Sequence, residues 1–142
     1  MTPLTLDQAQ TIIEGAFGAA KAASMNALCI VVLDEGGHVR ASARQDGVPF
    51  GRVDVAFAKA YGAVSIGPNS RQLEQAALER PHFMAGVIGA SGGTVVPVAG
   101  GVVVLDGNGE RIGAVGISGD TSDNDEVAAI AGIEAAGLTA AG

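Results

Sequence analysis

The segment Ala27–Gln45 reads ALCIVVLDEGGHVRASARQ and decides the fold of the chain. It begins with a continuous apolar run, rich in β-branched residues, which is typical of a buried strand. Glu35–His38 follows, and its two adjacent glycines supply the positive φ angles that a tight hairpin turn needs. From Val39 onward, apolar or small residues alternate with polar ones, as in a strand with one covered face. The segment therefore predicts an antiparallel hairpin.

Helices are predicted on both sides of this hairpin. Thr5 and Gln8 have the spacing of a capping box, which marks the start of a helix. Apolar residues then recur at the spacing of one helical face, and the same period returns in Val53–Val64. Asn69, with Gln72 three residues later, is expected to cap a short third helix. Gly137 has the position of a C-terminal helix cap. The helices are expected over residues 5–23, 53–67, 69–79 and 123–136.

The second half of the chain predicts another hairpin. Asp106–Gly109 reads DGNG, a strong turn signal between two apolar segments. Strands are expected over Val95–Val98, Val102–Leu105 and Arg111–Ser118, whereas the glycine-rich segment Pro81–Thr94 is expected to be a loop. The order α-β-β-α-α-β-β-α, with hairpins joining the strands, predicts an α+β fold: an antiparallel sheet with helices packed on it.

Composition and charge narrow the possible partners. The chain has 142 residues, 22 of them Gly, no Trp, and a formal net charge of −7. This length predicts one domain over residues 1–142. Because an acidic chain offers no basic surface for phosphate groups, we expect neither nucleic acid nor a membrane as a partner. The scarcity of aromatic residues suggests that some apolar surface is buried against other copies of the chain.

The N-terminal segment lacks the basic and apolar regions of a signal peptide, which predicts a cytoplasmic location. Cys29 is the one cysteine and lies in an apolar run, so we expect an inert core thiol.

Two glycine motifs favour structural over chemical roles. Gly89–Gly93 matches the G-x-S-x-G nucleophile motif, but no His follows position 82, as the motif would require. Gly113–Gly119 leads into a helix and resembles an anion-binding loop. Four carboxylates crowd that helix start, where they would repel an anion and are better explained as helix caps. These carboxylates are Asp120, Asp123, Asp125 and Glu126.

Candidate functional side chains gather around the first hairpin and the helix after it. Arg44 and Asp46 lie where the second strand leads into that helix, and Lys59 lies on it among apolar residues. Lys59 is either a salt-bridged or snorkelling side chain or a cationic anchor for carboxylates, in which case the three residues converge. His82, beside Phe83, suits a loop over a planar ligand or axial ligation of iron, or is a simple loop residue. His38 is expected to be solvated in its turn.

These motifs, in this order, resemble the GlcG/HbpS-type heme-binding family, which includes the C-terminal domain of PduO proteins. The resemblance rests on Val31–Val39 (VVLDEGGHV), Arg44–Gly47 (RQDG), Ala56–Tyr61 (AFAKAY), and Gly113–Gly119 (GAVGISG) followed by Asp123–Ala129. It implies a five-stranded antiparallel sheet with helices, assembly into dimers or larger rings such as octamers, and heme or a similar ligand near the helical face or between subunits. The residues that match the family's patterns are Asp34, His38, Arg44, Asp46, Lys59 and Ser118.

The resemblance leaves two functional hypotheses, beside a third option in which the protein is a structural oligomer with a vestigial pocket. In the first, the protein binds heme for storage or degradation, with Arg44 and Lys59 neutralising the propionates. The first helix lacks the His that ligates iron in some members, so ligation would fall to His38, His82, Met84 or an oxygen atom. In the second, a small enzyme without a cofactor acts on a carboxylate-bearing catabolic intermediate, as in members found in catabolic operons. Arg44 and Lys59 would then hold the carboxylate, and Asp46 or His82 would move protons.

Overall fold

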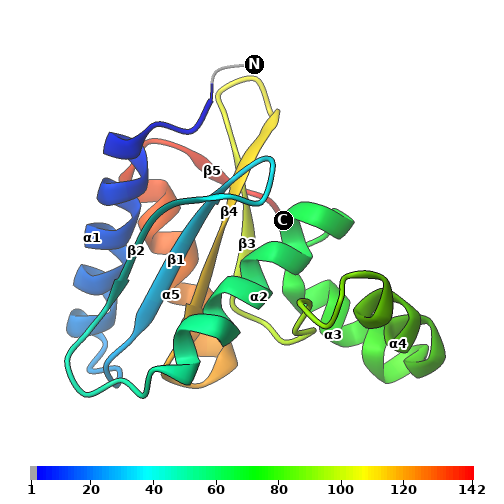
Figure 1. Cartoon of the computed structure of the whole chain (residues 1–142). Coiled ribbons are helices and arrows are strands. Elements are labelled where there is room, and N and C mark those ends of the chain that lie inside the picture. The colour runs from blue at the N-terminus through cyan, green and yellow to red at the C-terminus, as the bar shows by residue number, and fades with distance from the viewer. Residues whose placement is uncertain (1–2) are drawn as a thin grey trace.

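A computed structural model describes residues 3–142 as a five-stranded antiparallel sheet with helices on both faces (Figure 1). The helices are α1 (Leu6–Ala22), α2 (Gly51–Ile66), α3 (Ser70–Glu79), α4 (Pro81–Ala90) and α5 (Ser122–Ala135). The strands are β1 (Cys29–Asp34), β2 (Val39–Arg44), β3 (Gly101–Leu105), β4 (Arg111–Ser118) and β5 (Thr139–Ala140). The predicted α+β class is confirmed.

The sheet has the order β2-β1-β4-β3-β5, so the two predicted hairpins lie side by side. Strand β1 pairs with β2 on one side and with the central strand β4 on the other. In this register Cys29 lies opposite both Arg44 and Ser118. One row across the end of the sheet therefore holds a guanidinium, a thiol and a hydroxyl, on side chains that share one face.

Helices α1 and α5 cover one face of the sheet and α2 covers the other (Figure 1). The side chains of β1 alternate between the two layers, as the period of a strand requires. Ile30 and Val32 pack into the core beneath α1 and α5, whereas Val31 and Leu33 pack beneath α2. Because both faces are covered, this strand needs the uninterrupted apolar run that its sequence shows.

Helix α2 lies unusually close to the sheet because glycines face it. A Cβ atom at Gly116 of β4 would lie 1.9 Å from the carbonyl oxygen of Ala56, and one at Gly101 of β3 would lie 2.2 Å from that of Lys59. Side chains at these positions would require the helix and sheet to separate. The glycines thus set the distance between the α2 backbone and the sheet.

Helices α3 and α4 extend away from the sheet, at the lower right in Figure 1. Helix α4 packs mainly against α3, and the two share a small core of their own. Leu73, Met84 and Val95 are the buried members of that core. This part of the molecule is therefore a separate packing unit beside the main layers.

Two predictions for this region are wrong. Pro81–Thr94 was expected to be a loop, but Pro81–Ala90 forms α4. Pro81 occupies the first turn, where its fixed φ favours a helix, and contacts with α3 compensate for the glycines. Val95–Val98 forms no strand; the fifth strand is instead the short β5 near the C-terminal end.

The predicted helix caps are partly confirmed. Thr5 and Gln8 form the reciprocal capping box, and Gly137 follows α5 with a φ of +74°. Asn69 precedes α3 but its side chain makes no capping bond. Its amide instead accepts from the Val103 backbone N–H and donates to the Ala141 carbonyl, which joins α3 to the edge of the sheet. Among residues 3–142, no helix combines the length and apolar character needed to cross a membrane.

Candidate functional site

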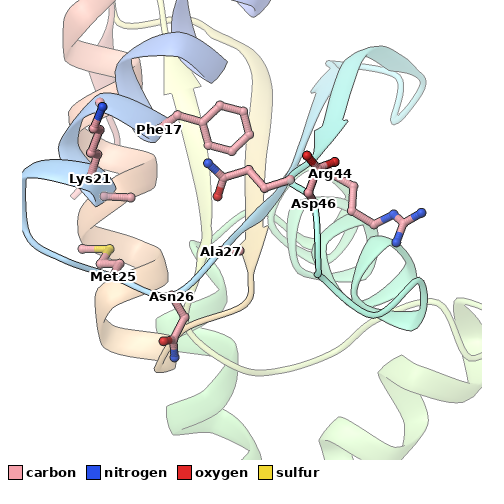
Figure 2. A pocket seen from close by; sticks show the side chains of 10 residues that line it. Phe17, Lys21, Met25, Asn26, Ala27, Arg44 and Asp46 are labelled. Atoms are coloured by element: carbon pink, nitrogen blue, oxygen red, sulfur yellow. The ribbon is translucent and has the colours of Figure 1, made fainter.

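An open cleft of about 690 Å³ lies between α1 and the end of β2 (Figure 2). Helix α1 contributes Phe17 and Lys21, and the segment between α1 and β1 contributes Met25. The remaining lining residues are Gly18, Ala20, Asn26, Ala27, Arg44, Gln45 and Asp46. The cleft therefore combines an aromatic ring, a thioether and an ammonium group, and it includes two of the predicted residues, Arg44 and Asp46.

The guanidinium of Arg44 points away from α1 in Figure 2. Arg44 is opposite Cys29 in the sheet, so its side chain leaves on the face covered by α2. There its Nη1 donates to the carbonyl oxygen of Val48 at 2.6 Å. Lys21 is consequently the cation on the α1 side of the cleft, and Arg44 forms its rim on the opposite side.

The face beneath α2 holds the row of Arg44, Cys29 and Ser118 described above. Arg52 of α2 donates through Nη1 to the Ser118 hydroxyl at 3.3 Å. Burial raises the pKa of the Cys29 thiol, and the charge of Arg44 opposes that shift. The thiol is therefore protonated near neutral pH, in agreement with the inert role expected from sequence.

Lys59 of α2 is buried between that helix and the sheet, and its ammonium is paired with a carboxylate of the same chain. Only 3% of this residue is exposed. Its Nζ lies 3.1 Å from Oδ2 of Asp125 and donates to the Ile117 carbonyl at 2.9 Å. Burial raises the pKa of Asp125, while the adjacent ammonium acts in the opposite direction. The pair links α2 to the start of α5 around the end of the sheet, and Lys59 does not line the cleft.

The carboxylates at the start of α5 have partners within the protein, but none of them is the helix cap that the sequence predicts. Thr121 caps the helix by accepting from the Asn124 backbone N–H. Arg71 of α3 pairs with Asp123 and Glu126, and these bonds raise the pKa of its guanidinium. Within the described chain, no group of three or more His, Cys, Asp or Glu side chains is placed to hold a metal ion.

Asp120 clamps the segment before β1 to the start of α5. Its carboxylate accepts from the Asn26 backbone N–H at 2.7 Å, from the Asn124 amide, and from the Thr121 backbone N–H. These bonds favour the charged form and lower the pKa of Asp120 below the ordinary range of an aspartate. Asn26 lines the cleft, so this clamp also positions one of its walls.

We expect Asp120→Asn to be destabilising at neutral pH and progressively less so in acid. A carboxyl with a lowered folded-state pKa stabilises the fold above its unfolded pKa, and this contribution is lost as pH falls through the folded-state value. Urea unfolding of both proteins between pH 2 and 7 measures the difference. If the difference in unfolding free energy between the two proteins is the same at every pH, the charge of the Asp120 carboxylate does not contribute to stability.

The predicted histidines lie elsewhere. His38 is 83% exposed in the β1–β2 turn and lies 3.5 Å from Asp34, whose carboxylate also accepts backbone N–H groups of the turn. His82 and Phe83 are exposed on α4, not on a loop, and neither lines the cleft. The Arg80 guanidinium lies 4.3 Å from the centre of the Phe83 ring. The expected convergence of Arg44, Asp46 and Lys59 is not found at this cleft, which contains Arg44 and Asp46 but neither Lys59 nor His82.

The G-x-S-x-G motif also has a structural role. Ser91 lies at the C-terminal end of α4 and donates to the Ile88 carbonyl. Its hydroxyl accepts the backbone N–H groups of Thr94 and Val95. The hydroxyl is thus used to close the turn after α4, as expected from the missing strand and His.

A family model described as "Haem degrading protein HbpS-like" matches residues 4–134. The chain belongs to the HbpS-like family. This confirms the resemblance inferred from its motifs. No curated protein sequence matches the chain.

Solved structures share the fold of this HbpS-like chain over almost its whole length. The heme complex of PduOC is 22% identical with a TM-score of 0.83, and the match covers 94% of this chain and 95% of that one. Klebsiella pneumoniae ORFY is 24% identical with a TM-score of 0.85, covering 96% and 93%. A double mutant of Streptomyces reticuli HbpS is 27% identical with a TM-score of 0.80, covering 94% and 87%.

Three main residues of this cleft could not be found from the sequence. Phe17, Lys21 and Met25 lie near the end of α1, where the pattern predicts Phe17 only as part of a helix face and assigns Lys21 and Met25 no role. Their shared cleft depends on the end of β2, which is about twenty residues further along the chain. The partner of Lys59 was missed for the same reason, because Asp125 is 66 positions away.

Proposed function

We propose that this HbpS-like chain binds heme, or a similar planar ligand with carboxylate groups, in the cleft between α1 and the end of β2. The observation that carries the proposal is the composition of that cleft. It places Phe17 and Met25 beside the ammonium of Lys21 in a volume of about 690 Å³. Cavities of roughly 300–1,000 Å³ with apolar walls and a few polar groups are typical small-molecule sites. The shared fold of the PduOC heme complex supports the same ligand class.

The lining residues fit the periphery of heme. Phe17 offers a flat apolar surface to the macrocycle, and Lys21 offers a charge partner for one propionate. Arg44 is a weaker candidate for a propionate because its guanidinium faces α2 and is bound to the Val48 carbonyl. Heme, when bound, supplies the redox chemistry of its iron, while the chain's own residues bind and orient the ligand.

The lining residues disfavour iron ligation by histidine in this cleft. His38 is in the β1–β2 turn and His82 is on α4, outside the lining residues. Among those residues, the thioether of Met25 is the side-chain group of a type that ligates heme iron in proteins. We therefore propose Met25, in place of His82, as the residue nearest the iron.

Hemin titration of the purified protein tests this function through the Soret band. We expect saturable binding, weakened about tenfold or more by Lys21→Glu, because the substitution replaces an attractive charge with a repulsive one. Phe17→Ala should weaken binding by a similar factor through lost apolar contact. Met25→Leu preserves an apolar side chain without sulfur and should shift the position of the Soret band.

The matched controls are His38→Ala and His82→Ala, which should leave both affinity and band position unchanged. A non-saturable titration of the wild-type protein would reject heme binding. Loss of the Soret band only in a histidine variant would place the ligand elsewhere in the molecule. Unfolding curves of each variant separate weaker binding from loss of fold.

The proposal extends to two further properties. The protein stores or degrades heme, and it assembles with other copies into dimers or larger rings. The exposed apolar side chains of Phe83 and Leu78, 39% and 74% exposed, support assembly. A cytoplasmic location stays a prediction.

The alternative enzyme has less support in the geometry. In that hypothesis Arg44 and Lys59 hold a carboxylate together, but the Lys59 ammonium is buried and paired with Asp125. A buried ammonium that already has an internal partner is poorly placed to receive a substrate anion from solvent. The roles of Asp46 and His82 in proton transfer stay predictions.

A further inference from the structure

A second groove, of about 380 Å³, lies between the N-terminal half of α2 and the segment that follows α4. Its walls are mainly apolar and come from Val55, Phe57 and Ala58 on one side and Val96 on the other. The remaining lining residues are Asp54, Gly93 and Thr94. It shares no lining residue with the cleft between α1 and the end of β2. The two sites can therefore hold different occupants.

The groove carries one uncompensated negative charge. Asp54 is exposed, and its carboxylate has no hydrogen bond or ion pair with any of residues 3–142. It lies in the first turn of α2. The groove therefore suits an occupant that combines an apolar group with a positive charge.

The chain itself displays such a combination on α4. Arg80 lies over the ring of Phe83, and both side chains are exposed. The Arg80 guanidinium has no carboxylate partner among the described residues. Met84 is the one buried residue of this very apolar helix. A helix of this composition would ordinarily bury a whole face, so part of its packing surface is unused.

We propose that α4 of one copy docks in the groove beside α2 of a second copy, with Phe83 against the apolar walls and Arg80 paired with Asp54. This inference rests on the proposed assembly and names its interface. A second copy is favoured over a small ligand because the complementary charge and ring already occur together on this chain. Gly86 and Gly89 have open space beside them, which allows a neighbouring backbone to approach α4 closely.

Charge reversal tests the contact without disturbing the core. Sedimentation velocity over a concentration series should show that Asp54→Arg and Arg80→Glu each lower the association constant about tenfold or more. The double variant Asp54→Arg/Arg80→Glu should recover association, because it restores opposite charges with their positions exchanged. An equimolar mixture of the two single variants should also associate, because each bears the partner that the other lacks.

The controls separate this interface from general effects. Arg40→Glu makes the same charge change at an exposed position on β2 and should leave association unchanged. Phe83→Ala should weaken association, whereas Leu6→Ala, an exposed apolar position on α1, should not. Hemin binding should persist in all of these variants.

Three outcomes would overturn the inference. If the wild-type protein assembles and both single reversals assemble equally well, the interface is elsewhere although assembly stands. If the double variant associates no better than the single ones, the two charges do not meet. If the wild-type protein is monomeric throughout, the interface and the proposed assembly both fail, whereas the Soret titration decides the heme proposal independently.

Discussion

Replacing Lys59 by Met will destabilise the fold by about 3–5 kcal/mol, because it leaves the Asp125 carboxylate buried without its cation. The two side chains are 3% and 2% exposed, so water cannot replace the lost ammonium. Removing the cation raises the Asp125 pKa further, and the destabilisation should therefore increase as pH rises above the ordinary range of aspartate. Urea unfolding at several pH values measures both effects.

The chain contains a matched control, because Lys21 is its other lysine. Lys21 is exposed, and Lys21→Met should change stability by less than about 0.5 kcal/mol. The double variant Lys59→Met/Asp125→Leu should recover most of the lost stability, since buried ion pairs are often replaceable by apolar side chains of similar volume. A small effect of Lys59→Met at neutral pH would show that the pair does not hold α2 to α5.

The second large effect is expected at Gly116. Its α-carbon faces the backbone of α2, and a Cβ atom would lie 1.9 Å from the Ala56 carbonyl oxygen. Gly116→Ala must therefore displace a whole helix from the sheet, since a backbone oxygen cannot rotate away as a side chain would. We expect a loss of about 3 kcal/mol or more in the free energy of unfolding.

Gly18→Ala provides the contrast. Gly18 lies within α1, and a Cβ atom there meets no heavy atom within 4 Å. The substitution should stabilise the protein by about 0.5–1 kcal/mol, because alanine loses less conformational entropy in a helix than glycine. Thermal or urea unfolding of the two alanine variants should thus give shifts of opposite sign. Equal shifts would mean that α2 adapts to a side chain at position 116.

The sequence was sufficient to predict the two hairpins of the sheet because their signals are local. The apolar run of β1, the alternation within β2, the Gly-Gly turn and the capping box each depend on residues within a few positions of one another. The short strand β5 gave no such signal, and the valine-rich segment Val95–Val98 was wrongly expected to be a strand. Helix α4 was missed because its stability comes from contacts with α3, whereas its glycines lower the local preference for helix. A pattern within one segment cannot predict how that segment packs against a distant one.

The difference between local signals and distant contacts also explains which residues of the candidate site could be predicted. Arg44 and Asp46 were identified by their place at the end of a strand, and both line the cleft. Lys59 stood out because a cation is unusual on an apolar helix face. The pattern could not distinguish a ligand from an internal carboxylate as its partner, since Asp125 comes from the other side of the sheet.

The separate small core beneath α4 determines where the protein tolerates substitution. Helix α4 packs mainly against α3 and not against the sheet, so substitutions on its exposed side change the outer surface at little cost to the central layers. Residues near Gly116 have no such freedom, because a single added carbon atom meets the backbone of α2. We therefore expect the outer face of α4 to accept a wider range of side chains than the contact between β4 and α2.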